Sequence, residues 1–228
     1  MVSRAIAAKI DQTFLDRTTT PARMQTLIKE SLSVGFAAIV VQPYMVGQAS
    51  ELIAGSASAL CTVAGFPLGF EAAYSKRDEA VRAVEEGADE IDVVINAAWI
   101  KAKMLQKVLN ELKCVTEAVK ALKKEGSLVK VIVETALLDK EEKIAVLRVV
   151  EQSGADYIKT STGFGGLAGA QLEDVELFAS LRTTNLKIKA SGGIRTLDAA
   201  KRFVEAGAER IGTSGGLGIV AEEAALDA

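Results

Sequence analysis

The 228-residue chain contains no histidine. This absence excludes catalytic triads that use histidine and zinc sites with histidine ligands. It also removes the side chain that most often acts as a general base near neutral pH. Any acid or base chemistry must therefore use lysine, aspartate, glutamate, tyrosine, cysteine or water.

Cysteine is scarce as well. The two cysteines, Cys61 and Cys114, lack the spacing of a metal site. Because cysteine is among the most buried residue types, we expect two reduced and mostly buried thiols.

Long apolar runs and blocks of like charge are also missing. The first eleven residues include Arg4 and Asp11 and no long apolar run, which indicates neither a signal peptide nor a membrane span. Across the chain, 27 basic residues stand against 30 acidic ones, for a net charge of -3, and the basic residues form no cluster. We therefore expect a cytoplasmic protein with no nucleic-acid partner and no membrane partner.

What the chain does contain is a weak repeat. A glycine follows an amphipathic stretch and precedes a short apolar run at four places, Gly35, Gly87, Gly154 and Gly207. Glycine there fits the left-handed residue that commonly ends a helix, so each following run is a candidate strand. The predicted strands are residues 7–10, 37–41, 60–64, 90–95, 128–133, 157–160, 186–190 and 210–213, of which the first is the weakest. The predicted helices are residues 21–34, 46–55, 75–86, 104–125, 140–153, 171–181, 197–206 and 216–226.

This alternation predicts an α/β protein with one (β/α)₈ TIM barrel, a single domain spanning residues 1–228. Strands nearly continuous in valine and isoleucine are typical of a parallel sheet covered on both faces. Eightfold alternation over this length is the pattern of a TIM barrel. A doubly wound open sheet is the alternative, but no Gly-x-Gly-x-x-Gly motif follows the first strand.

Charged residues lie on the inward faces of four predicted strands. Side chains alternate along a strand, and the apolar faces should contact the helices. The charged residues that then point into the barrel are Asp92, Lys130, Glu134, Lys159 and Lys189. Lys187 shares a face with Lys189 but should lie nearer the bottom of the barrel. The chemistry of a TIM barrel takes place at the C-terminal ends of its strands, where Lys159 and Lys189 are expected.

Three buried lysines against two carboxylates leave a surplus of about one positive charge, which favours one neutral amine near pH 7. A neutral lysine amine can attack a carbonyl and form a Schiff base. The pair of Lys159 and Lys189 is therefore the strongest functional signal in the sequence. A purely structural ion-pair network is the alternative.

Glycine-rich segments follow the last three predicted strands, at residues 160–166, 190–195 and 212–216. The loops after strands seven and eight, with a helix N-terminus, form the usual phosphate site of a TIM barrel. Each segment alone fits a tight turn, but the three together predict a phosphate site. Arg195 either contacts the phosphate loop or pairs at the start of the next helix.

Several segments resemble deoxyribose-phosphate aldolase. They are residues 90–94 (Glu-Ile-Asp-Val-Val), 130–135 (Lys-Val-Ile-Val-Glu-Thr), 158–163 (Ile-Lys-Thr-Ser-Thr-Gly) and 189–196 (Lys-Ala-Ser-Gly-Gly-Ile-Arg-Thr). Residues 65–69, Gly-Phe-Pro-Leu-Gly, also match. The motifs occur in order from about residue 11 to residue 216, so the resemblance covers nearly the whole chain.

The resemblance implies a class I aldolase without metal or cofactor, which reversibly cleaves 2-deoxy-D-ribose 5-phosphate to D-glyceraldehyde 3-phosphate and acetaldehyde. It implies that Lys159 forms the Schiff base, that Lys189 lowers the pKa of Lys159 and that Asp92 moves protons through water. The phosphate-binding positions that it implies are Gly163, Gly192, Gly193, Gly212 and Ser214. The expected supporting residues are Lys130, Glu134 and Asp11, the last at the end of the first strand. A homodimer or homotetramer is expected.

The sequence departs from the family pattern at Gln12, where many members have histidine, at Asp16, where lysine is common, and at Gly215, where some have serine. It ends at Ala228 without the tyrosine tail that some members use. We expect Gln12 and Asp16 to lie away from the chemistry. The alternative functions are another Schiff-base barrel aldolase with a different phosphorylated substrate, a non-catalytic sugar-phosphate-binding barrel and a self-assembling structural protein.

Overall fold

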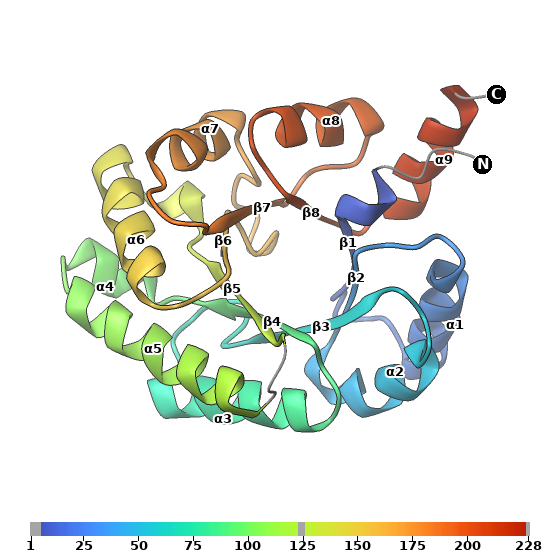
Figure 1. Ribbon diagram of the computed structural model, residues 1–228, viewed down its shortest axis with the longest axis horizontal. Helices are drawn as coiled ribbons and strands as arrows, with labels where there is room; N and C mark the ends of the chain where they lie inside the picture. The colour runs from blue at the N-terminus through green and yellow to red at the C-terminus, as the bar shows by residue number, and fades with distance from the viewer. Residues whose placement is uncertain (1–5, 123–125, 227–228) are drawn as a thin grey trace.

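The computed structural model describes residues 6–122 and 126–226, in which eight parallel strands close into a barrel in chain order (Figure 1). β1 pairs with β2 on one side and with β8 on the other, which closes the sheet. The predicted (β/α)₈ fold is confirmed. The strands are β1 (Ile10–Phe14), β2 (Ala38–Val41), β3 (Ala59–Ala64), β4 (Glu90–Val94), β5 (Leu128–Ile132), β6 (Tyr157–Lys159), β7 (Lys187–Ser191) and β8 (Arg210–Thr213).

Helices surround the barrel as an outer ring (Figure 1). They are α1 (Pro21–Leu32), α2 (Val46–Ile53), α3 (Ala73–Glu85), α4 (Ala97–Lys101), α5 (Leu105–Leu122), α6 (Lys140–Gln152), α7 (Leu172–Leu181), α8 (Leu197–Glu205) and α9 (Gly216–Leu226). Short 3-10 helices are η1 (Ala7–Lys9), η2 (Pro43–Met45) and η3 (Thr135–Leu137). No helix within the described residues has the length and apolarity needed to cross a membrane.

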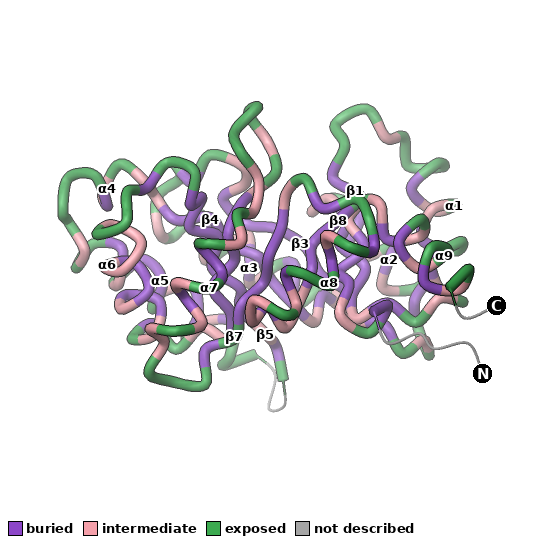
Figure 2. Tube along the Cα trace, turned by 90° about the horizontal axis from the view of Figure 1, so that it is seen from above, coloured by how far each residue is buried: buried purple, intermediate pink, exposed green. Residues whose placement is uncertain are grey.

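The ring packs onto the barrel because the outward faces of the strands are apolar. Ile91 and Val93 of β4 point outward and are fully buried, as are Val108 and Leu112 of α5 in the same core cluster. Burying one such side chain contributes roughly 1.5–3 kcal/mol. Buried segments accordingly run through the middle of the molecule, and exposed segments lie at its edges (Figure 2).

The predicted first strand was wrong. Residues 7–9 form η1, and β1 begins at Ile10 and ends at Phe14. The apolar residues before Ile10 suggested a strand, whereas β1 itself contains Asp11, Gln12 and Thr13. A strand whose inner face is polar lacks the apolar signature of its neighbours. Asp11 therefore lies near the beginning of β1, deep in the barrel, and not at the strand's end.

Other boundaries are within two residues of the prediction. The short helix α4 was missed; its N-cap Asn96 accepts a hydrogen bond from the backbone N–H of Ala98. The helix predicted at residues 104–125 corresponds to α5, and its predicted end at residues 123–125 lies outside the described residues.

A buried ion pair anchors the loop between β3 and α3. Lys76 of α3 donates hydrogen bonds to the carbonyl oxygens of Gly69 (2.9 Å) and Val94 (2.8 Å) and to Glu111 of α5 (2.9 Å). Both charged side chains are fully buried. Phe66 of this loop packs edge-to-face on Phe164 of the loop after β6, with ring centroids 5.1 Å apart. The two loops are thereby joined at the C-terminal end of the barrel.

Candidate active site

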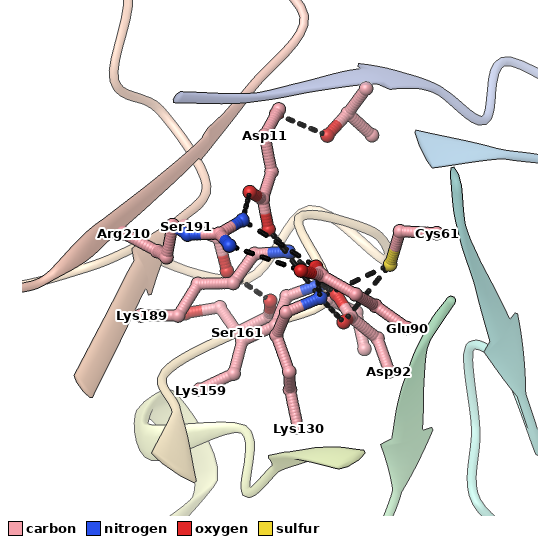
Figure 3. Close-up of polar contacts among 12 residues, drawn as sticks. Asp11, Cys61, Glu90, Asp92, Lys130, Lys159, Ser161, Lys189, Ser191 and Arg210 are labelled. Atoms are coloured by element: carbon pink, nitrogen blue, oxygen red, sulfur yellow. Dashed lines mark hydrogen bonds and ion pairs between the residues drawn. The ribbon is translucent and has the colours of Figure 1, made fainter. Parts of the chain in front are cut away.

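Asp92 lies inside the barrel, and its carboxylate contacts three lysines (Figure 3). Its Oδ2 atom accepts from Lys159 and from Lys189, each at 2.7 Å, and its Oδ1 atom accepts from Lys130 at 2.8 Å. The register explains this meeting, since Lys159 is paired with Lys189, and Asp92 with Lys130, on neighbouring strands. The structure thus brings together four of the five charged residues predicted to point inward.

A second layer of charge lies nearer the N-terminal ends of the strands. Asp11 contacts Lys189 at 2.5 Å and also binds Arg210, the first residue of β8. Arg210 binds Glu90 at 3.0 Å, and Glu90 in turn binds Lys130 at 2.6 Å. The catalytic-end lysines and the bottom of the barrel therefore belong to one continuous network (Figure 3).

Lys159 and Lys189 share one oxygen of Asp92, but their surroundings shift their pKa values in opposite directions. Burial lowers the pKa of Lys159, and the Lys189 ammonium lowers it further, against the opposing effect of Asp92. Burial also disfavours the charge on Lys189, but Asp11 and Asp92 outweigh it and raise the pKa of Lys189. Lys159 is therefore the amine that loses its proton more readily, and Lys189 remains the cation beside it.

The acidic partners of these lysines are held ionised. Burial opposes the charge on Asp92, yet the three lysines keep its pKa well below the usual value. The thiol of Cys61 lies 3.3 Å from Asp92 Oδ1, and burial with the Asp92 charge raises its pKa to about 12. Cys61 is therefore a neutral neighbour of Asp92. Both cysteines are free, as predicted, although Cys114 is partly exposed.

A cavity of about 450 Å³ opens above this network. Lys159 lines it, together with residues of the loops after β1, β6, β7 and β8. All five positions expected to bind phosphate line the same cavity; they are Gly163, Gly192, Gly193, Gly212 and Ser214. Arg195 also lines it. One cavity thus joins the candidate nucleophile to the glycine-rich loops.

Two of these glycines are required for different reasons. Gly193 has a φ of +80° and nothing within 4 Å of where a Cβ would lie, so its backbone is open to the cavity. A Cβ on Gly212 would lie 2.8 Å from Ser191 Cβ and 3.1 Å from Lys189 Cε. The bare Cα of Gly212 therefore leaves room for the Lys189 side chain.

We expected Gln12 and Asp16 to lie away from the chemistry; of the two, the structure places Asp16 at the cavity. Gln12 donates to the carbonyl oxygen of Ser214 at 3.2 Å and accepts from the N–H of Gly216 at 2.9 Å. Gln12 therefore fixes the loop after β8, because its amide satisfies both a donor and an acceptor of that backbone.

Glu134 does not join the lysine cluster. It has a left-handed backbone, with φ of +51°, and its Oε2 atom accepts from the N–H of Thr162 at 3.0 Å and from its hydroxyl at 2.5 Å. Since Thr162 lies three residues after Lys159 and lines the cavity, Glu134 supports the loop after β6. Lys187 is exposed at the start of β7, as expected for the bottom of the barrel.

The chain matches a model of the DeoC/LacD family aldolases over residues 5–222. It belongs to the DeoC/LacD aldolase family. A deoxyribose-phosphate aldolase of Caldicellulosiruptor saccharolyticus is 42% identical over 98% of this chain and 100% of its own length. One of Caldanaerobacter subterraneus is 43% identical over 95% of this chain and 93% of its own length.

Solved structures of similar proteins agree with this assignment. A tetrameric deoxyribose phosphate aldolase from Aeropyrum pernix superposes with a TM-score of 0.88 at 32% identity, covering 98% of this chain and 92% of its own. The sequence matches and the structural superposition therefore agree on the family and on the barrel fold.

Three charged or polar members of this aldolase's inner network were missed from the sequence, namely Glu90, Arg210 and Cys61. Glu90 has the same strand parity as Asp92, so extending the alternation by one step would have found it. Arg210 was treated as the first residue of an apolar strand. Its signal was weak because a charged residue at the start of a strand is usually solvated.

Within the described ranges, no group of three or more cysteine, aspartate or glutamate side chains is arranged to hold a metal ion.

Proposed function

We propose that this chain is a class I aldolase that reversibly cleaves 2-deoxy-D-ribose 5-phosphate to D-glyceraldehyde 3-phosphate and acetaldehyde, with Lys159 as the Schiff-base lysine. The observation that carries the proposal is that the Lys159 amine and the glycine-rich loops line one cavity. The shared name of the curated relatives, deoxyribose-phosphate aldolase, supports this substrate.

Lys159 begins the reaction as a neutral amine. Its proton is most easily lost because burial and Lys189 lower its pKa, and Asp92 at 2.7 Å is placed to exchange that proton. The amine attacks the aldehyde carbon of the open-chain sugar and forms a carbinolamine. Protonation of the carbinolamine hydroxyl through Asp92 and a water releases water and leaves a protonated Schiff base.

The protonated Schiff base then accepts the electrons of the breaking bond. A base removes the proton of the C3 hydroxyl, the C2–C3 bond breaks, and its electron pair moves onto the iminium to give an enamine. Glyceraldehyde 3-phosphate leaves. Protonation of the enamine carbon and hydrolysis of the resulting imine release acetaldehyde and return the Lys159 amine. In the synthetic direction the same steps run in reverse.

The phosphate is held away from the reacting carbons. Gly193 opens its backbone to the cavity, and Ser214 lines the same wall near the start of α9. N–H groups at a helix start favour an anion. Binding the remote phosphate orients the aldehyde toward Lys159, so that binding energy is converted into rate.

The proposal is tested by supplying the purified protein with 2-deoxy-D-ribose 5-phosphate and measuring glyceraldehyde 3-phosphate. We expect turnover that is lost in Lys159→Ala. Turnover of another phosphorylated sugar in place of this one would favour the alternative aldolase. Phosphate binding without any turnover would favour a non-catalytic sugar-phosphate-binding barrel.

We further propose that the enzyme acts in the cytoplasm and works as a homodimer or homotetramer. A doubly charged phosphate ester does not cross an apolar membrane unaided, so its enzyme is expected where phosphorylated sugars are made. Closed symmetric assemblies are the common state of soluble oligomers, and the Aeropyrum pernix protein is described as a tetramer.

A further inference from the structure

Arg210 is a buried charge for which the proposed mechanism has no use. Its side chain is 14% exposed and binds Asp11 and Glu90 near the N-terminal ends of the strands. Its guanidinium carbon lies 5.8 Å from the centre of the Tyr157 ring. Arg210 is outside the set of residues that line the cavity, so it has no path to the substrate.

Arg210 is nevertheless connected to Lys159. In the register of the sheet, Lys159 is paired with Lys189 and Lys189 with Arg210. Asp11 lies between the last two, with contacts to both, and Lys189 shares Asp92 Oδ2 with Lys159. Arg210 is therefore two strands from Lys159 and joined to it by alternating charges (Figure 3).

The buried network has a net charge of zero only when one of its lysine amines is deprotonated. Among the described residues, its cations are Lys130, Lys159, Lys189 and Arg210, and its carboxylates are Asp11, Glu90 and Asp92. Four cations against three carboxylates leave one positive charge in excess. A buried excess charge is costly, and the network becomes neutral when one amine loses its proton.

We propose that Arg210 is a positioning residue that keeps the Lys159 amine neutral, by supplying the third permanent cation of the buried network. The inference rests on the proposed role of Lys159 as nucleophile. Without Arg210, the three carboxylates would be balanced by Lys130, Lys189 and a protonated Lys159. The resting enzyme would then hold its nucleophile as an ammonium ion.

The expected shift in the pKa of Lys159 follows from its distance to Arg210. Two strand spacings place Arg210 on the order of 10 Å from Lys159. A unit charge at that distance inside a protein shifts a pKa by about one unit. Arginine suits this role because a guanidinium stays protonated when buried. A lysine at the same position is also expected to stay charged, because Asp11 and Glu90 lie beside it.

Other charged or ionisable groups face the same network from β1 and from β3 to β7. They are Asp11 of β1, Cys61 of β3, Glu90 and Asp92 of β4, Lys130 of β5, Tyr157 of β6, and Lys189 of β7. Cys61 stays neutral because its pKa is raised to about 12. The net charge of the network therefore depends on the carboxylates, the lysines and Arg210.

The test measures the protonation of Lys159 without relying on turnover. The rate at which acetic anhydride acetylates Lys159 is measured from pH 5 to pH 10 by peptide mass spectrometry, with exposed Lys113 as internal reference. In Arg210→Gln we expect the midpoint for Lys159 to rise by about one pH unit, and in Arg210→Lys to stay near that of the parent protein. An unchanged midpoint in folded Arg210→Gln would overturn the inference.

A charge change of opposite sign gives a second test. Glu90→Gln removes a carboxylate that contacts Arg210 and Lys130, so the Lys159 midpoint should fall. If Arg210→Gln does not fold, Glu90→Gln decides: a lower midpoint supports the inference, and an unchanged or higher one overturns it. Combining Arg210→Gln with Glu90→Gln should return the Lys159 midpoint toward the parent value. A merely structural role of Arg210 would not predict this return.

A matched control is Arg182→Gln. Arg182 also binds a glutamate, Glu209 at 2.8 Å, but it lies in a partly exposed pair after α7. We expect no shift of the Lys159 midpoint in this variant; a shift equal to that of Arg210→Gln would overturn the inference. Borohydride trapping of the parent protein tests the proposed function separately, because acetylation reports the amine's charge even if no Schiff base forms.

Discussion

Lys159 and Lys189 donate to the same oxygen of Asp92, each at 2.7 Å. Two ammonium groups on one buried carboxylate oxygen repel each other, and the one with fewer acidic partners is the first to lose its proton. Lys189 has a second carboxylate, Asp11, at 2.5 Å, whereas among the described residues Lys159 pairs with no carboxylate other than Asp92. The asymmetry supports the proposed roles of Lys159 as nucleophile and of Lys189 as the amine that stays charged.

The first prediction concerns Lys189→Met. Removing this cation takes away a charge that lowers the pKa of Lys159, so the pKa of Lys159 rises and a smaller fraction of it is neutral at pH 7. We expect activity at pH 7 to fall by roughly tenfold or more, with partial recovery as the pH is raised, because a shift of one unit is a tenfold change in the neutral fraction. The measurement is kcat/KM from pH 6 to pH 10. The exposed Lys113→Met is the control, and a flat loss at every pH would contradict the electrostatic role.

The second prediction concerns Gln12→Ala. The alanine variant leaves the N–H of Gly216 and the carbonyl of Ser214 without their partner, so the loop after β8 loosens. We expect KM for the phosphorylated aldehyde to rise by about tenfold, since a hydrogen bond contributes roughly 0.5–1.5 kcal/mol. The KM for unphosphorylated glyceraldehyde should change little.

Gln48→Ala provides the comparison, because Gln48 is exposed and binds only the side chain of Gln25 in the described hydrogen bonds. Equal increases of KM for the two aldehydes in Gln12→Ala would show that this residue acts on the reacting end and not on the phosphate.

Much of this site could be predicted from sequence because strands impose a strict alternation. Asp92, Lys130, Lys159 and Lys189 were placed inside the barrel from parity alone, and they contact one another. The same rule misplaced Glu134, which lies two residues beyond Ile132, the last residue of β5. Its left-handed φ breaks the alternation, and no pattern in the sequence signals that change.

The lower layer of the network could not be predicted in the same way. Asp11 was assigned to the end of the first strand because the apolar residues before it were taken for the strand itself. Whether Asp11, Glu90 and Arg210 meet depends on the stagger of the closed sheet, which pairs Asp11 with Gly212 and Lys189 with Arg210. That stagger is a property of the barrel and not of any local segment.

The third prediction concerns stability. Lys76→Met leaves Glu111 buried without its cation and removes the hydrogen bonds to Gly69 and Val94. Breaking a buried pair by removing one partner costs roughly 3–5 kcal/mol. We expect the urea unfolding midpoint to fall by the corresponding amount. Arg23→Ala, which breaks an exposed pair with Glu30, should cost less than about 1 kcal/mol; similar losses in the two variants would contradict the account of the β3–α3 loop.

The central claim is that the Lys159 amine forms the covalent intermediate. The direct measurement is incubation with acetaldehyde, reduction with sodium borohydride and location of the ethyl group by peptide mass mapping. The account predicts a gain of one ethyl group on Lys159, absent in Lys159→Arg and weakened in Lys189→Met at pH 7. An adduct on another lysine of the cavity network, or none in the parent protein, would contradict it.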